Sequence, residues 1–363
     1  MRSRQWYLDS MQAQRIWETS TGKGITVAVI DSGVDSSVPE LQGQLLAGTD
    51  FSDDQHDANY DSEGHGTSMA MIIAGQRKGD HAWGLAPGSK ILPIRSGNKR
   101  WSFHMAKSIR YATDHGAKVI NISWAGTPTE ESRVDLQPAI EYANKNGLLI
   151  FAGSGNDGDK GNPAKYPASL PGVVGVGAVD KSLKVAKFST YGPQVALAAP
   201  GVDIPTRCTK ELFDCVAQGT SNATAIASAS AALIWSAHPT WTNNQVLRVM
   251  MQTAGKPEDG KVPSKYLGYG IVRPRKVLVD KEGDPGPADV NPLLAAHREP
   301  APSGTARSRE SGDNNKATDT APESDSFPKW PLVAGGGVAA LAVILGGLLI
   351  ARRKKTQLST HSH

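Results

Sequence analysis

Three side chains in this sequence have the types and positions that nucleophilic catalysis requires: a serine, a histidine and an aspartate. Ser221 lies at the start of residues 220–234, a run of small and apolar residues without glycine or proline that predicts a closely packed helix. At a helix N-terminus the hydroxyl lies in the positive end of the dipole, and unpaired N–H groups can bind a developing oxyanion. Taken alone, the stretch is more typical of a serine that caps a buried helix.

The histidine and the aspartate are placed where they could serve such a serine. His65 lies between two glycines and directly before a predicted helix, so its imidazole has room to turn toward a partner. Asp31 ends residues 25–30, an apolar β-branched run that predicts a buried strand of a parallel sheet. The carboxyl ends of such strands are where these sheets place their sites. An Asx turn is an equal alternative for Asp31 on its own.

A glycine-rich turn at residues 153–158 carries a fourth candidate, Asn156. Its side-chain N–H groups could act as donors at the edge of the sheet. The turn lacks the Lys-Ser/Thr ending of a P-loop and the G-x-G-x-x-G spacing, so it gives little support to nucleotide binding. A tight turn that needs glycine and asparagine for positive φ explains the same residues.

The elements expected to position these residues alternate along the chain. Helix-length segments, among them residues 102–115 and 135–146, separate several apolar strand-length runs. This alternation predicts an α/β fold with a parallel sheet and right-handed crossovers. The runs predicted as strands are 25–30, 90–94, 118–123, 148–152 and 173–178.

Along the chain the three candidates occur in the order acid, base, nucleophile. An α/β-hydrolase would place the serine first and the histidine last, and residues 219–223 do not fit its G-x-S-x-G turn. The order and the motifs resemble those of the subtilisin-like serine proteases, the subtilases, over about residues 5–280. The matching motifs are Asp-Ser-Gly at 31–33, Gly-His-Gly-Thr at 64–67, Ser-Gly-Asn at 154–156 and Gly-Thr-Ser at 219–221.

The resemblance implies a role for each matching residue. Ser221 would be the nucleophile, His65 the general base, Asp31 the residue that orients the histidine, and Asn156 an oxyanion donor. The implied reaction is peptide-bond hydrolysis through an acyl-enzyme, without a cofactor or a metal. Two segments resemble those that line the family's substrate cleft; they comprise Ser123, Trp124, Ala125, Gly126, Ala152, Gly153, Ser154 and Gly155.

Three positions depart from the family's usual residues. Asn222 stands where a methionine or an aromatic residue is common, Ala225 where a proline is common, and Ala125 where a glycine is usual. The added methyl group of Ala125 predicts a preference for a small or modest apolar residue directly before the scissile bond. None of the three departures changes a position that matches the catalytic set.

The C-terminal part of the sequence predicts a membrane anchor. Residues 1–280 form the expected peptidase domain, and residues 281–330 are rich in proline, serine and aspartate, which predicts a disordered linker. Residues 331–351 include an apolar stretch long enough to cross a hydrocarbon core of about 30 Å. The four cations at 352–355 place the basic tail, residues 352–363, in the cytoplasm and the peptidase domain outside.

The N-terminus does not fit this topology by itself, since residues 1–9 contain no apolar core of a signal peptide. We interpret the start as truncated; a tail-anchored protein with the opposite orientation is the alternative. The early Gln-Trp-Tyr-Leu stretch at 5–8, the proline-rich linker and the C-terminal helix also resemble mycosins, membrane-anchored subtilases of type VII secretion. A weakly active subtilase scaffold that stabilises such a secretion complex is therefore the second functional hypothesis.

The remaining features restrict the partners. Cys208 and Cys215 are the only cysteines and have no metal-ligand spacing, so outside the cell a disulfide between them is expected, whereas free thiols would fit the cytoplasm. The acidic loop at 50–61 lacks the spacing of an EF-hand and is expected to be solvated. The net charge of the whole chain is +4 and is thinly spread apart from the four cations at 352–355, which does not favour binding of nucleic acid.

Overall fold

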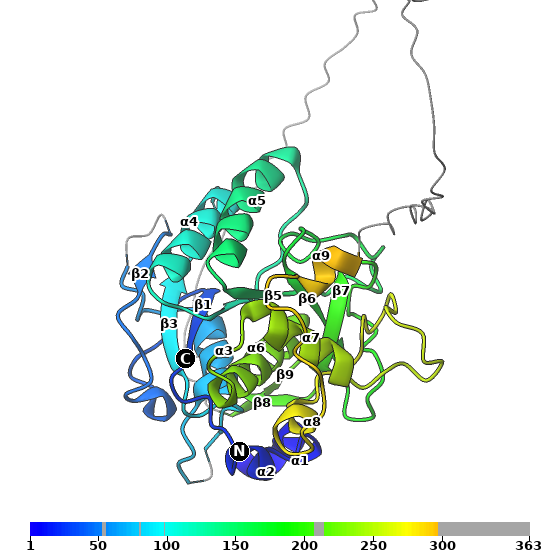
Figure 1. Cartoon of the computed structure of the whole chain (residues 1–363). Coiled ribbons are helices and arrows are strands. Elements are labelled where there is room, and N and C mark those ends of the chain that lie inside the picture. The colour runs from blue at the N-terminus through cyan, green and yellow to red at the C-terminus, as the bar shows by residue number, and fades with distance from the viewer. Residues whose placement is uncertain (53–55, 80, 98, 207–213, 297–363) are drawn as a thin grey trace, which may run out of the picture. The chain divides into compact units, whose positions relative to one another are not determined.

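The fold is a three-layer α/β sandwich built on a parallel sheet (Figure 1). The computed structural model describes residues 1–52, 56–79, 81–97, 99–206 and 214–296. Seven strands form the sheet in the order β2-β3-β1-β4-β5-β6-β7, and each neighbouring pair is parallel. The strands are β1 Thr26–Asp31, β2 Thr49–Asp50, β3 Lys90–Arg95, β4 Val119–Ile122, β5 Leu149–Gly153, β6 Val174–Val179 and β7 Val195–Pro200.

Helices cover both faces of this sheet, as the predicted alternation requires. One face packs against α4 and α5, and the other against α3 and α6, with α7 and α8 beyond them (Figure 1). The long helices are α3 His65–Ala74, α4 Trp101–Asp114, α5 Glu130–Lys145, α6 Thr220–Ala237 and α7 Asn243–Thr253. The short ones are α1 Trp6–Ser10, α2 Ala13–Trp17, α8 Pro274–Leu278 and α9 Pro292–Ala296, with 3₁₀ turns at Arg2–Arg4 and Pro39–Leu41.

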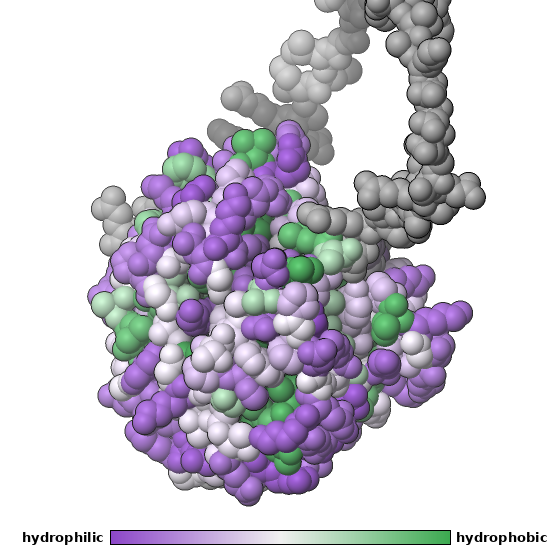
Figure 2. Space-filling model, viewed as in Figure 1, coloured by the Kyte–Doolittle hydropathy of each residue, from purple (hydrophilic) through white to green (hydrophobic). Residues whose placement is uncertain are grey.

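The side chains of β1 show why the sheet needs two helical layers. Val27 and Val29 belong to the apolar core that contains α3 and α6, whereas Ala28 and Ile30 belong to the core that contains α4 and α5. Successive strand residues point to opposite faces, so a strand that is apolar throughout must be covered twice. Figure 2 shows that the outer surface of the viewed face is mostly hydrophilic, with apolar residues in scattered patches.

Helix α6 is the central helix of one layer. It contacts α3, α7, α8 and five strands, β1 and β4 to β7, and nearly all its side chains are buried. The predicted run of alanine and serine explains this position, because small side chains allow a helix to lie close to several neighbours at once. The residue at its second position is Ser221, so the packing of α6 fixes the place of the candidate nucleophile.

The structure adds elements that the sequence analysis did not predict. The edge strands β2 and β7 were not anticipated, nor was the antiparallel hairpin of β8 Ile204–Thr206 and β9 Cys215–Ala217. Helix α5 begins at Glu130, one turn earlier than predicted, because Thr129 and Ser132 form a capping box there. Residues 281–296, placed in the predicted linker, lie against α7 in the structure: Arg248 donates hydrogen bonds to the carbonyl oxygens of Pro285, Pro287 and Val290.

Several predictions concern residues outside the described part of the chain. They are the remainder of the linker, the membrane-spanning segment, the basic tail and Cys208, hence also the Cys208–Cys215 disulfide. Within the described residues, no helix combines the length and apolar character that a membrane span requires. The linker beyond residue 296, the membrane-spanning segment, the basic tail and the disulfide therefore stay predictions.

Candidate active site

The best-defined contact of the site joins the candidate base to the candidate acid. Asp31 is the last residue of β1 and only 3% exposed, and His65 is the first residue of α3. Oδ1 of Asp31 lies 2.7 Å from Nδ1 of His65 and also accepts the backbone N–H of Ser32 at 2.8 Å. The Asp31 carboxylate, with smaller contributions from the charges of Asp61 and Glu63, raises the pKa of His65 above its usual value of 6.5.

A second carboxylate, that of Asp61, holds this pair in place. Its Oδ1 accepts hydrogen bonds from the hydroxyl of Ser32 at 2.8 Å and from the N–H of Gly64 at 2.9 Å. Its Oδ2 accepts from the N–H and the hydroxyl of Thr67. One buried side chain thus joins the end of β1 to the first turn of α3, where unpaired N–H groups and the dipole favour a negative charge.

The close approach of β1 and α3 depends on a glycine. A β-carbon at Gly66 would collide with the carbonyl oxygen of Gly33 and would lie 3.0 Å from the Cβ of Asp31. The glycine after His65 therefore does more than clear space for the imidazole, as the sequence analysis assumed. It allows the helix that carries the histidine to contact the strand that carries the aspartate.

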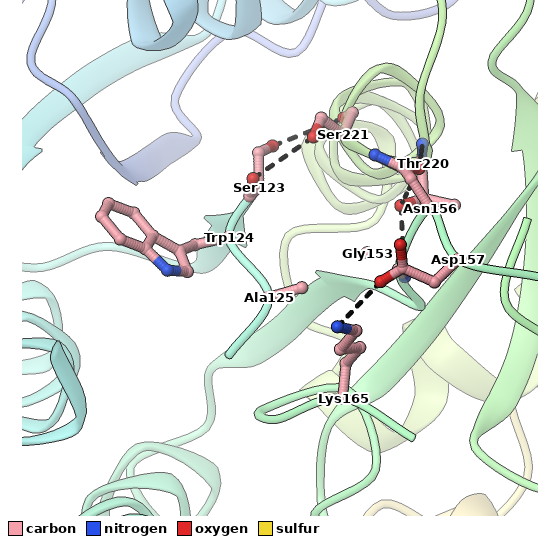
Figure 3. A pocket seen from close by; sticks show the side chains of 10 residues that line it. Ser123, Trp124, Ala125, Gly153, Asn156, Asp157, Lys165, Thr220 and Ser221 are labelled. Atoms are coloured by element: carbon pink, nitrogen blue, oxygen red, sulfur yellow. Dashed lines mark hydrogen bonds and ion pairs between the residues drawn. The ribbon is translucent and has the colours of Figure 1, made fainter. Parts of the chain in front are cut away.

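Ser221 lies in the first turn of α6 and faces a pocket (Figure 3). Its hydroxyl donates to the carbonyl oxygen of Ser123 at 3.2 Å. The structure records no hydrogen bond between the described side chains of Ser221 and His65. In this structure the Ser221 hydroxyl is therefore hydrogen-bonded to backbone and not to the candidate base.

Asn156 is held by the same first turn of α6. Its Oδ1 accepts the backbone N–H of Thr220 at 2.9 Å and the Thr220 hydroxyl at 3.1 Å. An oxygen that faces two donors leaves the Nδ2 group as the free end of the amide. A point at the β-carbon position of Gly219 lies 3.5 Å from this Nδ2 and 3.8 Å from the backbone nitrogen of Ser221. The two N–H groups therefore flank one small space, which the absent side chain of Gly219 leaves open.

The pocket beside Ser221 has a volume of about 240 Å³. Of the eight residues that the resemblance assigns to the cleft, it brings together five: Ser123, Trp124, Ala125, Gly153 and Gly155. The other three do not line it. Gly126 pairs with Tyr166 in a β-bridge, and both Ala152 and Ser154 are fully buried at the end of β5.

Two charged residues in the pocket were missed by the sequence analysis. Asp157 and Lys165 line it together with Asn156, and they form an ion pair of 2.8 Å (Figure 3). Asp157 follows the candidate asparagine directly and could have been suspected on that ground. Lys165 lies in a loop without any local motif, and only the tertiary structure brings it to the site. Asp61 was also missed as a positioning residue, although it lies four residues before His65.

The acidic loop at 50–61 was expected to be solvated, but the carboxylates at its two ends, Asp50 and Asp61, are buried and bonded to neighbouring elements. Asp50 forms an ion pair with Arg95 at 3.0 Å and accepts the N–H of Ser52, and this holds its pKa below the usual value against the effect of burial. Among the described residues, no group of three His, Cys, Asp or Glu side chains is arranged to hold a metal ion.

Comparison with known proteins gives this geometry a context. A sequence model of the Subtilase family, peptidase S8, matches residues 22–270. Subtilisin NAT of Bacillus subtilis subsp. natto is 35% identical over 258 residues, which cover 69% of this chain and 65% of that protein. The chain thus spans just under two thirds of that relative's length.

Solved structures agree with the sequence match. MycP1 from Mycobacterium smegmatis superposes with a TM-score of 0.68 at 28% identity and covers 79% of this chain and 87% of its own. MycP3, a protease from the type VII (ESX-3) secretion system, superposes with a TM-score of 0.65 at 29% identity, over 76% of this chain and 88% of its own. The chain therefore belongs to the Subtilase family of subtilisin-like serine peptidases.

Proposed function

We propose that this chain is a serine endopeptidase that cleaves proteins or peptides by means of Asp31, His65 and Ser221. The observation that carries the proposal is the convergence on one pocket of a serine hydroxyl and two N–H donors, those of Ser221 and Asn156. The Asp31–His65 hydrogen bond supplies the oriented base that such a serine needs. Family membership supports the same chemistry.

The first half of the reaction begins with a turn of the serine hydroxyl from the Ser123 carbonyl toward His65. His65 takes the proton while Oγ attacks the carbonyl carbon of the scissile bond. The Asp31 carboxylate stabilises the imidazolium that forms, which is the same interaction that raises the pKa of His65. The Ser221 N–H and the Nδ2 group of Asn156 receive the oxyanion.

The second half releases the products. The imidazolium of His65 gives its proton to the leaving amine, and the C–N bond breaks to leave an ester on Oγ of Ser221. A water molecule, deprotonated by His65, then attacks this ester. The same two N–H donors bind the second oxyanion, and the serine regains its proton.

The location is part of the proposal. We place the peptidase domain outside the cell, anchored by residues 331–351, because the sequence there is apolar and is followed by a basic tail. The structural similarity to MycP3, a protease from a type VII secretion system, supports a role beside a secretion complex of that kind. The alternative hypothesis, a weakly active scaffold for such a complex, is favoured by one observation: the Ser221 hydroxyl is bonded to Ser123 instead of His65.

Peptide hydrolysis by the purified protein and by its Ser221→Ala variant distinguishes these hypotheses. An endopeptidase shows turnover that the substitution reduces by about 10⁶, the loss reported for the nucleophile of subtilisin, a relative of this chain. Equal, near-background rates for both proteins, together with an unchanged thermal unfolding curve, would support the scaffold.

A further inference from the structure

A buried amide in the middle of β4 joins this strand to α6. Asn121 is fully buried, and its neighbours on the adjoining strands are Val29 and Phe151. An amide in such an apolar row costs free energy unless both of its ends form hydrogen bonds. Its Oδ1 accepts the hydroxyl of Ser228 at 3.1 Å, and its Nδ2 donates to Oγ of Ser123 at 3.0 Å. We call Asn121, Ser123 and Ser228 the Asn121 network.

The spacing of these residues explains why one strand and one helix meet at two places. Asn121 and Ser123 are two residues apart at the end of β4, so their side chains lie on one face of the sheet. Ser221 and Ser228 are seven residues apart in α6, so they share one face of the helix. The contact of Ser123 with Ser221 therefore lies at the end of the strand, and the contact of Asn121 with Ser228 lies deeper between the same two elements.

Ser123 and Ser221 are connected by two hydrogen bonds that run in opposite directions (Figure 3). The Ser221 hydroxyl donates to the Ser123 carbonyl oxygen at 3.2 Å, and the Ser123 hydroxyl donates to the Ser221 carbonyl oxygen at 3.4 Å. The second bond reaches the main chain of Ser221, so it does not depend on where the serine hydroxyl points. At 3.4 Å it is long, and its strength depends on how firmly the Ser123 hydroxyl is held.

Ser228 determines which way the amide of Asn121 faces. Because the Ser228 hydroxyl donates to Oδ1, the Nδ2 group is directed at Ser123. Oγ of Ser123 then receives a hydrogen bond and keeps its own proton for the Ser221 carbonyl oxygen. In a flipped amide, Oδ1 would face Ser123 and compete for that proton. A hydroxyl about two helical turns from the candidate nucleophile thus directs the donor at its main chain.

We propose that Asn121 and Ser228 are positioning residues for the first turn of α6. They hold the Ser123 hydroxyl as a donor to the main chain of Ser221, and so fix the backbone that carries both the nucleophile and its oxyanion N–H. This inference rests on the proposed peptidase function and adds two residues to the site that carries it out. The effect on rate can be large, because a misplacement of about 1 Å at a reacting centre costs about 10² in rate.

Ser228→Ala and Ser230→Ala form a matched pair of variants. Both serines are fully buried in α6, and each substitution removes one hydroxyl oxygen and no carbon. Ser230 donates to the carbonyl oxygen of Ile226 in its own helix at 2.8 Å, so Ser230→Ala should lower thermal stability and leave kcat unchanged. Ser228→Ala leaves Oδ1 of Asn121 unpaired and should lower kcat by about threefold to tenfold, the effect of one hydrogen bond, with little change in KM.

A double variant tests whether the two residues act together. Asn121→Ala removes the donor to Ser123 itself and should lower kcat by about tenfold to 10². If Ser228 acts only through this amide, Asn121→Ala combined with Ser228→Ala should be no slower than Asn121→Ala alone. Should Asn121→Ala fail to fold, the comparison of Ser228→Ala with Ser230→Ala decides by itself.

The rate of labelling by a fluorophosphonate provides a second measurement on each variant. This reagent reacts with the nucleophile and needs no extended peptide in the cleft. The rate of adduct formation on Ser221 should therefore fall in Ser228→Ala by about the same factor as kcat, and Ser230→Ala should be labelled as fast as the wild type. A purely structural role of Ser228 would lower the unfolding temperature alone.

The inference is overturned if Ser228→Ala keeps the wild-type kcat and labelling rate, or if Ser230→Ala loses as much of both. It is also overturned if the double variant is slower than Asn121→Ala by the full factor of Ser228→Ala, because the two residues would then act independently. In each of these cases the wild type still cleaves peptides, so the proposed peptidase function stands. If the wild type neither cleaves peptides nor is labelled, the peptidase function fails and the inference with it.

Discussion

Substitution of Asn156 tests the oxyanion site directly, because the structure separates the two ends of its amide. Asn156→Ala removes the Nδ2 donor, one of the two N–H groups beside the space at Gly219. In subtilisin, a relative of this chain, one such donor contributes about 3–4 kcal/mol to the transition state. We therefore expect kcat to fall by about 10² to 10³, with little change in KM, because the oxyanion exists only after attack.

The same substitution also removes the acceptor of the Thr220 N–H, a hydrogen bond of 2.9 Å. We expect this to lower the free energy of unfolding by about 1 kcal/mol. Asn156→Asp is the control that separates the two effects. It keeps an oxygen for Thr220 and so most of the stability, but it replaces the donor with an anionic oxygen, and kcat should stay at or below that of the alanine variant.

Steady-state kinetics with one good peptide, together with thermal unfolding of each variant, provide the measurements. The reasoning is refuted if Asn156→Ala loses less than about tenfold in kcat. It is equally refuted if KM rises while kcat is retained, which would assign Asn156 to substrate binding. Full activity in Asn156→Asp would show that the Nδ2 group has no part in the reaction.

Three further predictions follow from the geometry around the site. The neutral imidazole of His65 is the base and its pKa is raised, so kcat/KM should fall as pH decreases through a midpoint above 6.5. Glu63→Gln removes a negative charge near His65 and should lower that midpoint. An unchanged pH profile in this variant would contradict the prediction. Asp61→Asn should place an N–H group against the donors of Ser32 or Thr67. The free energy of unfolding should then fall by about 1–3 kcal/mol and kcat should decrease. If both values stay at those of the wild type, Asp61 does not position the site. Protease added to intact cells should cut within residues 297–330 and release a soluble fragment, which an immunoblot would detect. If these residues are cut only after the cells are lysed, the opposite topology is favoured.

The parts of the fold that could be predicted from the sequence are those with a strong local signal. The apolar run before Asp31 predicted a strand buried on both faces, and the structure places it as the third strand of the parallel sheet. The alanine-rich run after Gly219 predicted a helix that can lie close to its neighbours, and α6 contacts five strands of the sheet. In both cases the side chains of the segment itself determine how deeply the segment is buried and how closely it packs.

The parts that could not be predicted depend on residues far apart in the sequence. Arg248 determines where residues 285–290 lie, and nothing in that proline-rich stretch indicates such a partner. Lys165 reaches the pocket because its loop pairs with a segment near Ala125, at the bridge between Gly126 and Tyr166. Long-range contacts of this kind leave no periodicity or motif in the sequence.

The candidate site shows the same division. The candidate aspartate, histidine and serine were proposed from their neighbours, since a glycine on each side of His65 and a helix start at Ser221 are local features. The hydrogen bond of the Ser221 hydroxyl to Ser123 was not anticipated, because it is set by the distance between β4 and the first turn of α6. Because of this hydrogen bond, the reactivity of the Ser221 hydroxyl is the central question for the mechanism.

Covalent labelling of the serine answers that question most directly. The purified protein would be treated with a fluorophosphonate, digested and mapped by mass spectrometry, in parallel with Ser221→Ala and with Asp31→Asn. Our account predicts a single adduct on Ser221 in the wild type, formed much more slowly in Asp31→Asn because the imidazole then loses its orienting carboxylate. A wild type without an adduct on Ser221, in a protein that is folded and cleaves peptides, would contradict the assignment of Ser221 as the nucleophile.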